Sequence, residues 1–233
     1  MREIPVNEFF ETIQGEATFT GTPSLFLRLQ KCPVGCSFCD TKYTWYVNDY
    51  DETKDINDII NKKNLDFTKG EGNSKHIKLT NHEIFDLCKQ SKMNHIVFTG
   101  GEPCIYDLSH LTWLLNKNSN NRFTTQIETS GTFEILCDNH TWVTVSPKIG
   151  MKGGYEIVEQ AMFRANEIKF PVGKLKDIDK LKDLLQTWNI PKRVKIWLQP
   201  LSISTKATQL CIEQAMLNNW NISIQTHKYI NAR

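Results

Sequence analysis

Hydrophobic and polar positions alternate along this chain in two ways, and the two patterns follow one another repeatedly. Residues 24–30 (SLFLRLQ) have a period of two, which places Leu25, Leu27 and Leu29 on one face of a strand and Arg28 on the other. Similar short β-rich runs predict six further strands, at residues 95–99, 123–129, 142–146, 167–172, 194–199 and 222–226.

Helical spacing of apolar residues fills most of the intervals between these strands. The first helix is expected after Thr80, because Glu83 follows three residues later in a capping-box pattern. Four further helices are expected, beginning near Asp107, Tyr155, Asp177 and Ala207. Alternating strands and helices predict a mostly parallel sheet with helices outside. Six or seven strands cannot complete an eight-stranded barrel, so either an incomplete barrel or an open doubly wound sheet is expected.

One segment interrupts this regular pattern. Residues 46–78 are rich in Asp, Asn and Lys, and they contain an amphipathic run, residues 55–63 (DINDIINKK). A chain of 233 residues suits one sizeable domain. We therefore interpret residues 1–233 as a single domain and residues 46–78 as an insertion with some helix on its surface.

Composition excludes several classes of partner. The chain is 39% hydrophobic and 23% charged, which is ordinary for a globular protein. A net charge of +2 gives no electrostatic basis for binding nucleic acid or a membrane surface. No apolar run is long enough for a membrane span, and residues 1–16 contain no apolar signal core. We expect a cytoplasmic protein.

Three of the seven cysteines lie close together. Cys32, Cys36 and Cys39 have the spacing C-x3-C-x2-C, and in a reducing compartment such clusters more often bind metal than form disulfides. Three thiolates can hold three irons of a cuboidal [4Fe–4S] cluster and leave the fourth iron open for a ligand. The alternative is a zinc site with three cysteines and one histidine, but no histidine lies between Lys31 and Lys75.

Small or polar motifs follow six of the predicted strands. In parallel folds of this kind the carboxyl ends of the strands gather at one face, where functional sites form. The motifs are the cysteine segment and residues 100–103 (GGEP), 129–132 (TSGT), 146–148 (SPK), 199–202 (QPLS) and 226–228 (THK). We expect them to share one pocket.

The cysteine motif, with Phe38 before its last cysteine, resembles the signature of the radical S-adenosylmethionine (SAM) enzymes. The GGEP segment resembles the turn with which that superfamily holds the methionine amino group. Further segments resemble the 7-carboxy-7-deazaguanine synthases of the proteobacterial type. These are residues 10–16 (FETIQGE), Arg28, 39–41 (CDT), Thr99, 128–132 (ETSGT), 146–148 (SPK) and 225–228 (QTHK). The resemblance extends from about Pro5 to the C-terminus, and residues 46–78 carry little of it.

This resemblance implies a partial TIM-like barrel of about six parallel strands with outer helices. It implies a lyase that converts 6-carboxy-5,6,7,8-tetrahydropterin to 7-carboxy-7-deazaguanine with loss of ammonia, on the route to the modified tRNA nucleoside queuosine. The implied cofactors are a [4Fe–4S] cluster, Mg2+ and SAM, whose radical takes hydrogen from C6 of the pterin before SAM is regenerated. The implied partners are a flavodoxin- or ferredoxin-type electron donor and a second copy in a homodimer.

Residue roles follow from the same resemblance. Cys32, Cys36 and Cys39 match the cluster ligands, and Thr41 matches the protein ligand of Mg2+. The residues expected to contact SAM are Phe38, Cys39, Asp40, Gly101, Glu102, Ser130, Ser146, Pro147, Lys148 and Gln199. The residues expected to contact the pterin are Ile13, Gln14, Gly15, Glu16, Arg28, Thr99 and His227.

Arg28 also has an argument that is independent of the resemblance. Its strand face is opposite the three leucines, so it is expected to point into the barrel, where a buried arginine needs an anionic partner. A substrate carboxylate can provide a bidentate partner, and a structural ion pair to an acid such as Glu128 is the alternative.

One residue departs from the family pattern. The family usually has glycine after QGE, whereas this chain has Ala17. If that position requires a positive φ, alanine strains the loop.

The remaining cysteines and two tryptophans receive no role in the site. Cys88 and Cys211 fall within helical apolar patterns and are expected to be buried, and Cys104 lies beside the GGEP turn without an assigned role. Trp45 and Trp113 are expected to serve packing.

Two other functions compete with the synthase. A glycyl-radical activating enzyme has a similar size and a similar cysteine loop, but the QGE, CDT and QTHK segments argue against it. A non-enzymatic zinc-binding α/β protein is the second alternative, which metal and sulfide content would distinguish.

Overall fold

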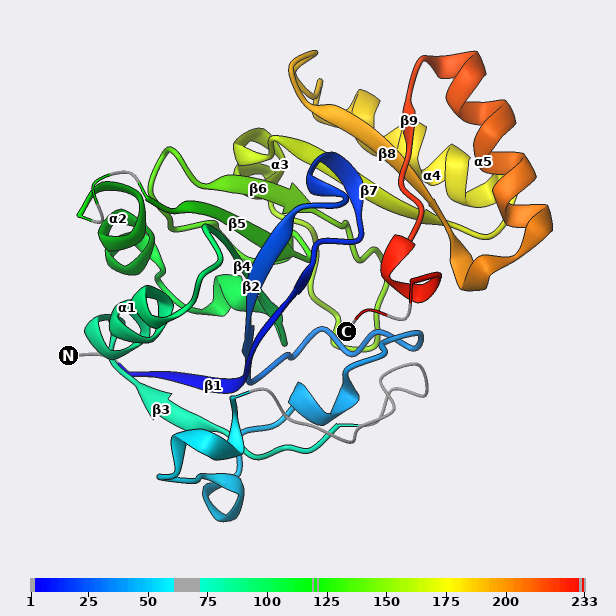
Figure 1. Cartoon of the computed structure of the whole chain (residues 1–233). Helices are drawn as coiled ribbons and strands as arrows, with labels where there is room; N and C mark the ends of the chain where they lie inside the picture. Colours follow the sequence, from blue (N-terminus) through cyan, green and yellow to red (C-terminus); the bar gives the residue numbers. More distant parts are fainter. Residues whose placement is uncertain (1–2, 61–71, 119, 121, 231, 233) are drawn as a thin grey trace.

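The computed structural model describes residues 3–60, 72–118, 120, 122–230 and 232. Nine strands form one sheet in the order β3-β1-β2-β4-β5-β6-β7-β8-β9, and within the described residues the sheet does not close on itself (Figure 1). The strands are β1 (Ile4–Ile13), β2 (Pro23–Leu29), β3 (Ile77–Leu79), β4 (His95–Gly100), β5 (Thr124–Thr129), β6 (Trp142–Val145), β7 (Glu167–Val172), β8 (Lys195–Pro200) and β9 (Asn221–Ile222).

The sheet is parallel from β2 through β4 to β9, and this confirms the predicted mostly parallel arrangement. The antiparallel strand β1 was not predicted; it pairs with both β2 and β3. Its first seven residues are all buried, so the period-two pattern that identifies a half-exposed strand is missing. The last strand is shorter than the predicted 222–226, because the chain turns away after Ile222 toward the loop that follows β1.

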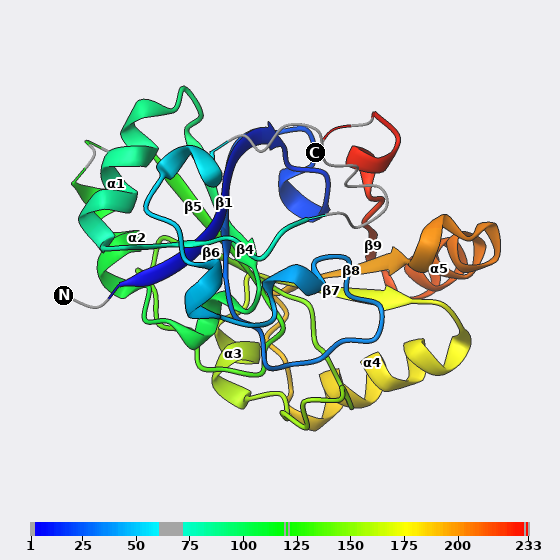
Figure 2. The same cartoon turned by 90° about the horizontal axis from the view of Figure 1, so that it is seen from below.

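Within the described part of the chain, five helices cover the outside of the sheet (Figures 1 and 2). All five were predicted, although α3 begins four residues later than its pattern suggested. Thr80 and Glu83 form the expected reciprocal capping box. The helices are α1 (Asn81–Gln90), α2 (Ser109–Lys117), α3 (Glu159–Arg164), α4 (Leu175–Thr187) and α5 (Thr205–Asn218).

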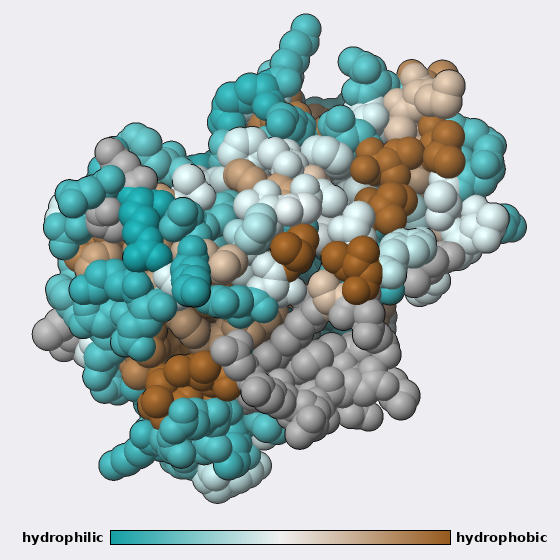
Figure 3. Space-filling view, in the orientation of Figure 1, coloured by the Kyte–Doolittle hydropathy of each residue, from teal (hydrophilic) through white to brown (hydrophobic). Residues whose placement is uncertain are grey.

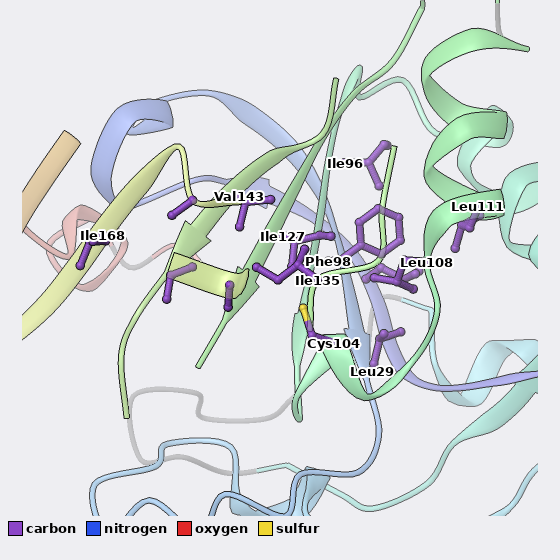
Figure 4. Close-up of a cluster of buried hydrophobic side chains, with 14 of the residues drawn as sticks. Leu29, Ile96, Phe98, Cys104, Leu108, Leu111, Ile127, Ile135, Val143 and Ile168 are labelled. Carbon is purple, nitrogen blue, oxygen red and sulfur yellow. The ribbon is translucent and has the colours of Figure 1, made fainter. Parts of the chain in front are cut away.

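The hydrophobic core lies between the sheet and these helices. Figure 4 shows Ile96 and Phe98 of β4 beside Leu108 and Leu111 at the start of α2. Strand β2 follows its predicted parity, because its three leucines belong to this core whereas Arg28 faces the inner cavity. Strand β2 therefore has an apolar outer face and an inner face that carries a polar group.

The described part of the predicted surface insertion is partly buried. Ile59 has no exposed surface, and its carbonyl accepts a hydrogen bond of 2.8 Å from the Phe9 N–H. Of the amphipathic run, the described helical part is one 3-10 turn, Ile56–Asp58, and residues 61–71 lie outside the described residues. This segment therefore contributes to the core as well as to the surface.

The outer surface shows where apolar groups are exposed. Figure 3 shows a mostly hydrophilic face with apolar patches toward α5, β9 and the chain end. Among the described residues, no helix has both the length and the apolar composition needed to cross a membrane.

Candidate active site

A cavity of about 420 Å3 lies at the carboxyl ends of the parallel strands, within the size range of small-molecule sites. It brings together every predicted site residue except Pro147. Pro147 is buried and lies between Ser146 and Lys148 in the sequence. The predicted residues in the cavity wall are Ile13, Gln14, Gly15, Glu16, Arg28, Cys32, Cys36, Phe38, Cys39, Asp40, Thr41, Thr99, Gly101, Glu102, Ser130, Ser146, Lys148, Gln199 and His227.

The cysteine loop, residues 30–46, is closed at its base by the side chain of Gln30. Its amide nitrogen donates hydrogen bonds to the main-chain carbonyls of Tyr43 (3.0 Å) and Tyr46 (2.6 Å). Its amide oxygen accepts one from Asn7 Nδ2 at 2.8 Å, which fixes the orientation of the Gln30 amide. One buried amide thus holds the two ends of the loop together.

Main-chain bonds continue this closure toward the thiols. The Lys31 N–H donates to the Thr44 carbonyl at 2.7 Å, and the Cys32 N–H donates to the Trp45 carbonyl at 3.1 Å. These bonds join the two ends of the loop without using its cysteine side chains.

The three thiols face the cavity in different environments. Burial raises the pKa of Cys32 to about 12 and also raises the pKa of Cys36. Both thiols therefore hold their protons until a metal displaces them. Cys39 Sγ accepts a hydrogen bond of 3.4 Å from Trp45 Nε1.

Three thiols on one loop can each bind a different iron of a cuboidal cluster. Cys32, Cys36 and Cys39 all line one cavity, as a [4Fe–4S] cluster requires.

The GGEP turn packs directly against the start of the cysteine loop. A Cβ atom on Gly101 would lie 2.1 Å from the Lys31 carbonyl oxygen, so only glycine fits there. The Glu102 N–H donates to that same carbonyl at 2.9 Å. The turn and the loop are thereby held in a fixed relation.

The Glu102 carboxylate connects this turn to the next strand. It is 2% exposed and accepts hydrogen bonds from Thr129 Oγ1 (2.6 Å), the Ser130 N–H (2.8 Å) and the Cys104 N–H (3.0 Å). An oriented carboxylate at the cavity wall can accept hydrogen bonds from an ammonium group of a ligand.

Lys148 provides a cation on another side of the cavity. Its Nζ donates to Ser146 Oγ at 2.8 Å and lies 5.3 Å from the centre of the Phe38 ring. Burial lowers the pKa of Lys148, and the charge that Cys36 carries when it is ionised acts in the other direction. A buried ammonium in this position favours an anionic ligand group.

An ion-pair network forms the opposite wall. Lys169 Nζ donates to Glu128 Oε2 at 2.8 Å and also contacts the Glu16 carboxylate. Burial opposes ionisation of Glu16, but Lys169 and Gln225 outweigh it and lower its pKa to about 2. Burial and the charge of Glu16 raise the pKa of Glu128 to about 7, although Lys169 acts in the other direction. Near neutral pH, Glu16 is a fixed anion and Glu128 can exchange a proton.

A buried polar chain orients these groups from behind. Gln126 Nε2 donates to Glu128 Oε1 at 3.0 Å, and Gln126 Oε1 lies 3.0 Å from His95 Nε2 and 3.1 Å from Gln14 Nε2. Burial lowers the pKa of His95, so its neutral form donates from Nε2 and accepts from Thr124 Oγ1 at Nδ1 (2.9 Å). The Gln14 and Glu128 side chains are therefore oriented before any ligand binds.

Arg28 points into the cavity, as its strand parity predicted. Its structural partner differs from the acid considered in the sequence analysis: Arg28 Nε donates to Glu8 Oε2 at 2.7 Å, and not to Glu128. Neighbouring antiparallel strands place these residues opposite each other, because Glu8 is the register partner of Arg28. The unpredicted strand β1 explains why this acid was missed.

The loop that follows β1 meets the THK segment at the cavity. The Thr226 N–H donates to the Gly15 carbonyl at 3.0 Å, and a Cβ on Gly15 would lie 2.3 Å from His227 Nδ1. Burial lowers the pKa of His227. Glycine in the QGE segment is what lets this histidine approach.

Ala17 has a positive φ, which is the condition under which the sequence analysis expected strain in this loop. Its φ is 53°, and its N–H donates to Ser223 Oγ at 2.9 Å. A left-handed alanine costs about 1–2 kcal/mol relative to the right-handed conformation, and the hydrogen bond helps to hold it.

Several residues in and around the site had no assigned role in the sequence analysis. Lys169 and Glu128 could have been found by the argument used for Arg28, because their strands place charged or polar residues opposite an apolar face. Trp45 was expected only to pack, yet it donates to Cys39. The residues without an assigned role also include Glu8, His95, Gln126 and Gln225.

Comparison with known proteins finds a matching family model, similar proteins and a similar solved structure. Residues 14–147 match the family model of a 4Fe-4S single cluster domain. The chain is 47% identical to 7-carboxy-7-deazaguanine synthase of Escherichia coli strain K12 over 98% of this chain and 99% of that protein. The enzyme of the same name from Buchnera aphidicola is 43% identical, with the same coverage. A solved structure described as the crystal structure of QueE from Escherichia coli has a TM-score of 0.88 and 46% identity, covering 96% of this chain and 94% of that one.

Proposed function

This chain belongs to the 7-carboxy-7-deazaguanine synthase family, and from that premise we infer that it is a radical SAM lyase acting on 6-carboxy-5,6,7,8-tetrahydropterin. The product is 7-carboxy-7-deazaguanine, formed with loss of ammonia on the queuosine route. The observation that carries this function is the convergence of the cysteine triad, the GGEP turn and the QGE segment on one cavity. A glycyl-radical activating enzyme and a zinc-binding protein are not supported by relatives of this name and coverage.

The cysteine-loop side of the cavity is proposed to hold the cofactors. Cys32, Cys36 and Cys39 would bind a [4Fe–4S] cluster, which together with SAM supplies the radical that takes hydrogen from the substrate. The oriented Glu102 carboxylate suits the amino group of SAM, and the buried Lys148 ammonium suits its carboxylate. Other proposed SAM contacts are Phe38, Cys39, Asp40, Gly101, Ser130, Ser146, Pro147 and Gln199.

The strand side of the cavity is proposed to hold the pterin. Arg28 would bind the substrate carboxylate, while Glu8 keeps its guanidinium in place. The oriented amide of Gln14 and the ionised Glu16 suit the hydrogen-bonding edge of the pterin. Glu128, with its pKa of about 7, is the group in this wall best suited to exchange a proton during the rearrangement. Other proposed pterin contacts are Ile13, Gly15, Thr99 and His227.

We propose that Thr41 is a ligand of Mg2+. Thr41 lines the cavity, and its hydroxyl lies 3.6 Å from Cys39 Sγ. A hard cation prefers oxygen ligands and commonly uses substrate oxygens to complete its coordination.

The organisation of the protein in the cell is also proposed. Residues 1–233 would act as one domain carrying an insertion at 46–78, as a homodimer with a flavodoxin- or ferredoxin-type electron donor. A cytoplasmic location is supported by the cysteines, which are all unpaired.

The test is anaerobic turnover by the cluster-loaded protein with 6-carboxytetrahydropterin, SAM, Mg2+ and a strong reductant, followed by mass spectrometry. We expect 7-carboxy-7-deazaguanine in excess over the SAM consumed. Steady release of 5′-deoxyadenosine and methionine without this product would contradict the substrate while keeping the radical SAM class. A colourless preparation with stoichiometric zinc and no sulfide would contradict the class itself.

A further inference from the structure

Trp45 contacts two of the three cysteines of the loop in two different ways. Its indole Nε1–H donates to Cys39 Sγ at 3.4 Å, a normal distance for a hydrogen bond to sulfur. Its main-chain carbonyl accepts from the Cys32 N–H at 3.1 Å. A single residue that follows the motif by six positions thus contacts both of its ends.

The position of this indole is set by the chain itself. The turn Lys42–Thr44 reverses the backbone, with the Thr44 N–H and hydroxyl both donating to the Thr41 carbonyl at 2.9 and 2.8 Å. The Trp45 N–H then donates to the Lys42 carbonyl at 3.1 Å. The turn thus fixes the backbone of Trp45, and from that position its indole N–H reaches Cys39 Sγ.

In the part of the chain that the structure describes, not every buried tryptophan N–H has a partner. Trp142 and Trp197 illustrate this, because their buried Nε1 atoms have no hydrogen-bond partner among the described residues. Trp45 differs from them in that its donor points at a proposed cluster ligand. The contact is therefore a property of this position in the loop and not a general feature of tryptophans in the fold.

A hydrogen bond to a cysteine sulfur changes the balance between the two charge states of an iron–sulfur cluster. The one-electron reduction from [4Fe–4S]2+ to [4Fe–4S]1+, by a low-potential flavin or iron–sulfur donor, adds one negative charge that is shared with the sulfurs. A donor to such a sulfur stabilises the reduced state more than the oxidised one, which raises the reduction potential. We propose that Trp45 positions Cys39 and raises the reduction potential of the cluster through its indole N–H. The inference rests on the proposed cluster function of the triad.

The first test replaces the donor and keeps an aromatic ring. Trp45→Phe and the control Trp113→Phe, which alters a half-exposed tryptophan of α2, are loaded with cluster anaerobically and assayed for iron and sulfide. An EPR-monitored redox titration should give a more negative midpoint for Trp45→Phe and an unchanged one for Trp113→Phe. Loss of this hydrogen bond should lower the reduced-to-oxidised ratio at a fixed potential by up to about tenfold, which corresponds to about 59 mV for one electron. A fully loaded Trp45→Phe with the wild-type midpoint would overturn the proposal.

The second test uses the wild-type protein, so it does not require a variant that folds and holds a cluster. Wild-type protein grown with indole-15N tryptophan is reduced, and pulsed EPR is used to look for a weak 15N coupling to the cluster spin. We expect a coupling that persists in Trp113→Phe and disappears in Trp45→Phe. If Trp45→Phe cannot hold a cluster, the wild-type spectrum decides: a coupling supports the proposal, and its absence overturns it.

Neither test contains the pterin, so the outcomes separate the two proposals. A lower midpoint in Trp45→Phe, together with no turnover of the pterin by wild-type protein, would contradict the substrate alone. Turnover by wild-type protein, with unchanged midpoint and no coupling, would contradict the role of Trp45 alone.

Discussion

The two walls of the cavity are stabilised by different interactions. The cysteine loop is held mainly by main-chain hydrogen bonds and by the amide of Gln30, while its three thiols do not pair with one another. The strand wall is held by side chains, with Lys169 between Glu16 and Glu128. The loop therefore leaves its thiols for a metal cluster, whereas the strand wall has its charges matched before a substrate arrives. One wall needs its cofactor to be complete, and the other is preorganised.

The largest effect is expected from removing a thiol of the loop wall. Cys36→Ala should lose the cluster and all activity, because a cluster cannot be held by two of its three cysteines. Cys211→Ala is the matched control, since this cysteine is fully buried in α5, away from the cavity, and should keep both. Iron and sulfide content, followed by turnover, gives the answer. A full cluster in Cys36→Ala would contradict the triad.

The second-largest effect tests whether the stability of the strand wall depends on Lys169. Lys169→Met leaves two buried carboxylates facing each other and should lower the free energy of unfolding by about 3–5 kcal/mol. Adding Glu128→Gln should recover part of this loss. Urea unfolding measures both, with the exposed Lys180→Met as a control expected within about 0.5 kcal/mol of wild type. A loss in Lys169→Met no greater than that of the control would mean that the network does not stabilise this wall.

A smaller effect separates substrate binding from cofactor binding. Arg28→Lys keeps a cation beside Glu8 but loses the planar fork that binds a carboxylate. The Kd for the pterin should rise by about tenfold or more, and the Kd for SAM should change little. Calorimetry with each ligand measures this. Equal losses for both ligands would place Arg28 outside the pterin site.

The pH dependence of stability gives a further comparison within the strand wall. The pKa of Glu128 is raised from 4.5 to about 7, so its contribution to stability is present below pH 4.5 and is lost as pH rises through about 7. Glu128→Gln does not ionise, so its unfolding free energy relative to wild type should increase between pH 5 and pH 8. Urea unfolding at several pH values tests this, and a difference that stays flat would contradict the raised pKa.

The smallest effect concerns the loop that carries Glu16. Ala17→Gly relieves a left-handed alanine but makes the unfolded chain more flexible, so these contributions oppose each other. We expect a net gain of at most about 1 kcal/mol, measured as a change in the denaturant midpoint. A loss of more than 1 kcal/mol would mean that the alanine methyl contributes packing that outweighs the strain.

Much of the fold was predictable because outward and inward residues alternate along the parallel strands. The parity of residues 24–30 is enough by itself to place Arg28 in the cavity and the leucines in the core. Strand β1 was missed because burial on both faces removes the alternation on which that argument depends. Missing this strand also concealed Glu8, the partner of Arg28.

The candidate site was predictable where residue identity carried the chemistry, as with the cysteine triad and the GGEP turn. Gln126 and His95 act by contacts between strands and with the loop that carries Gln14, and no local spacing reveals such contacts. The Trp45–Cys39 bond depends on the direction of one side chain after a 3-10 turn, which the spacing of six residues does not specify.

The contact between Gly15 and Thr226 joins residues 211 positions apart. During synthesis the cysteine loop leaves the ribosome long before residues 225–228 exist, so the cavity stays open on that side until those residues dock. Contacts of such long sequence separation are slow to form because a large loop must close first. The side of the cavity formed by Gly15 and the C-terminal segment is therefore expected to be the last to form.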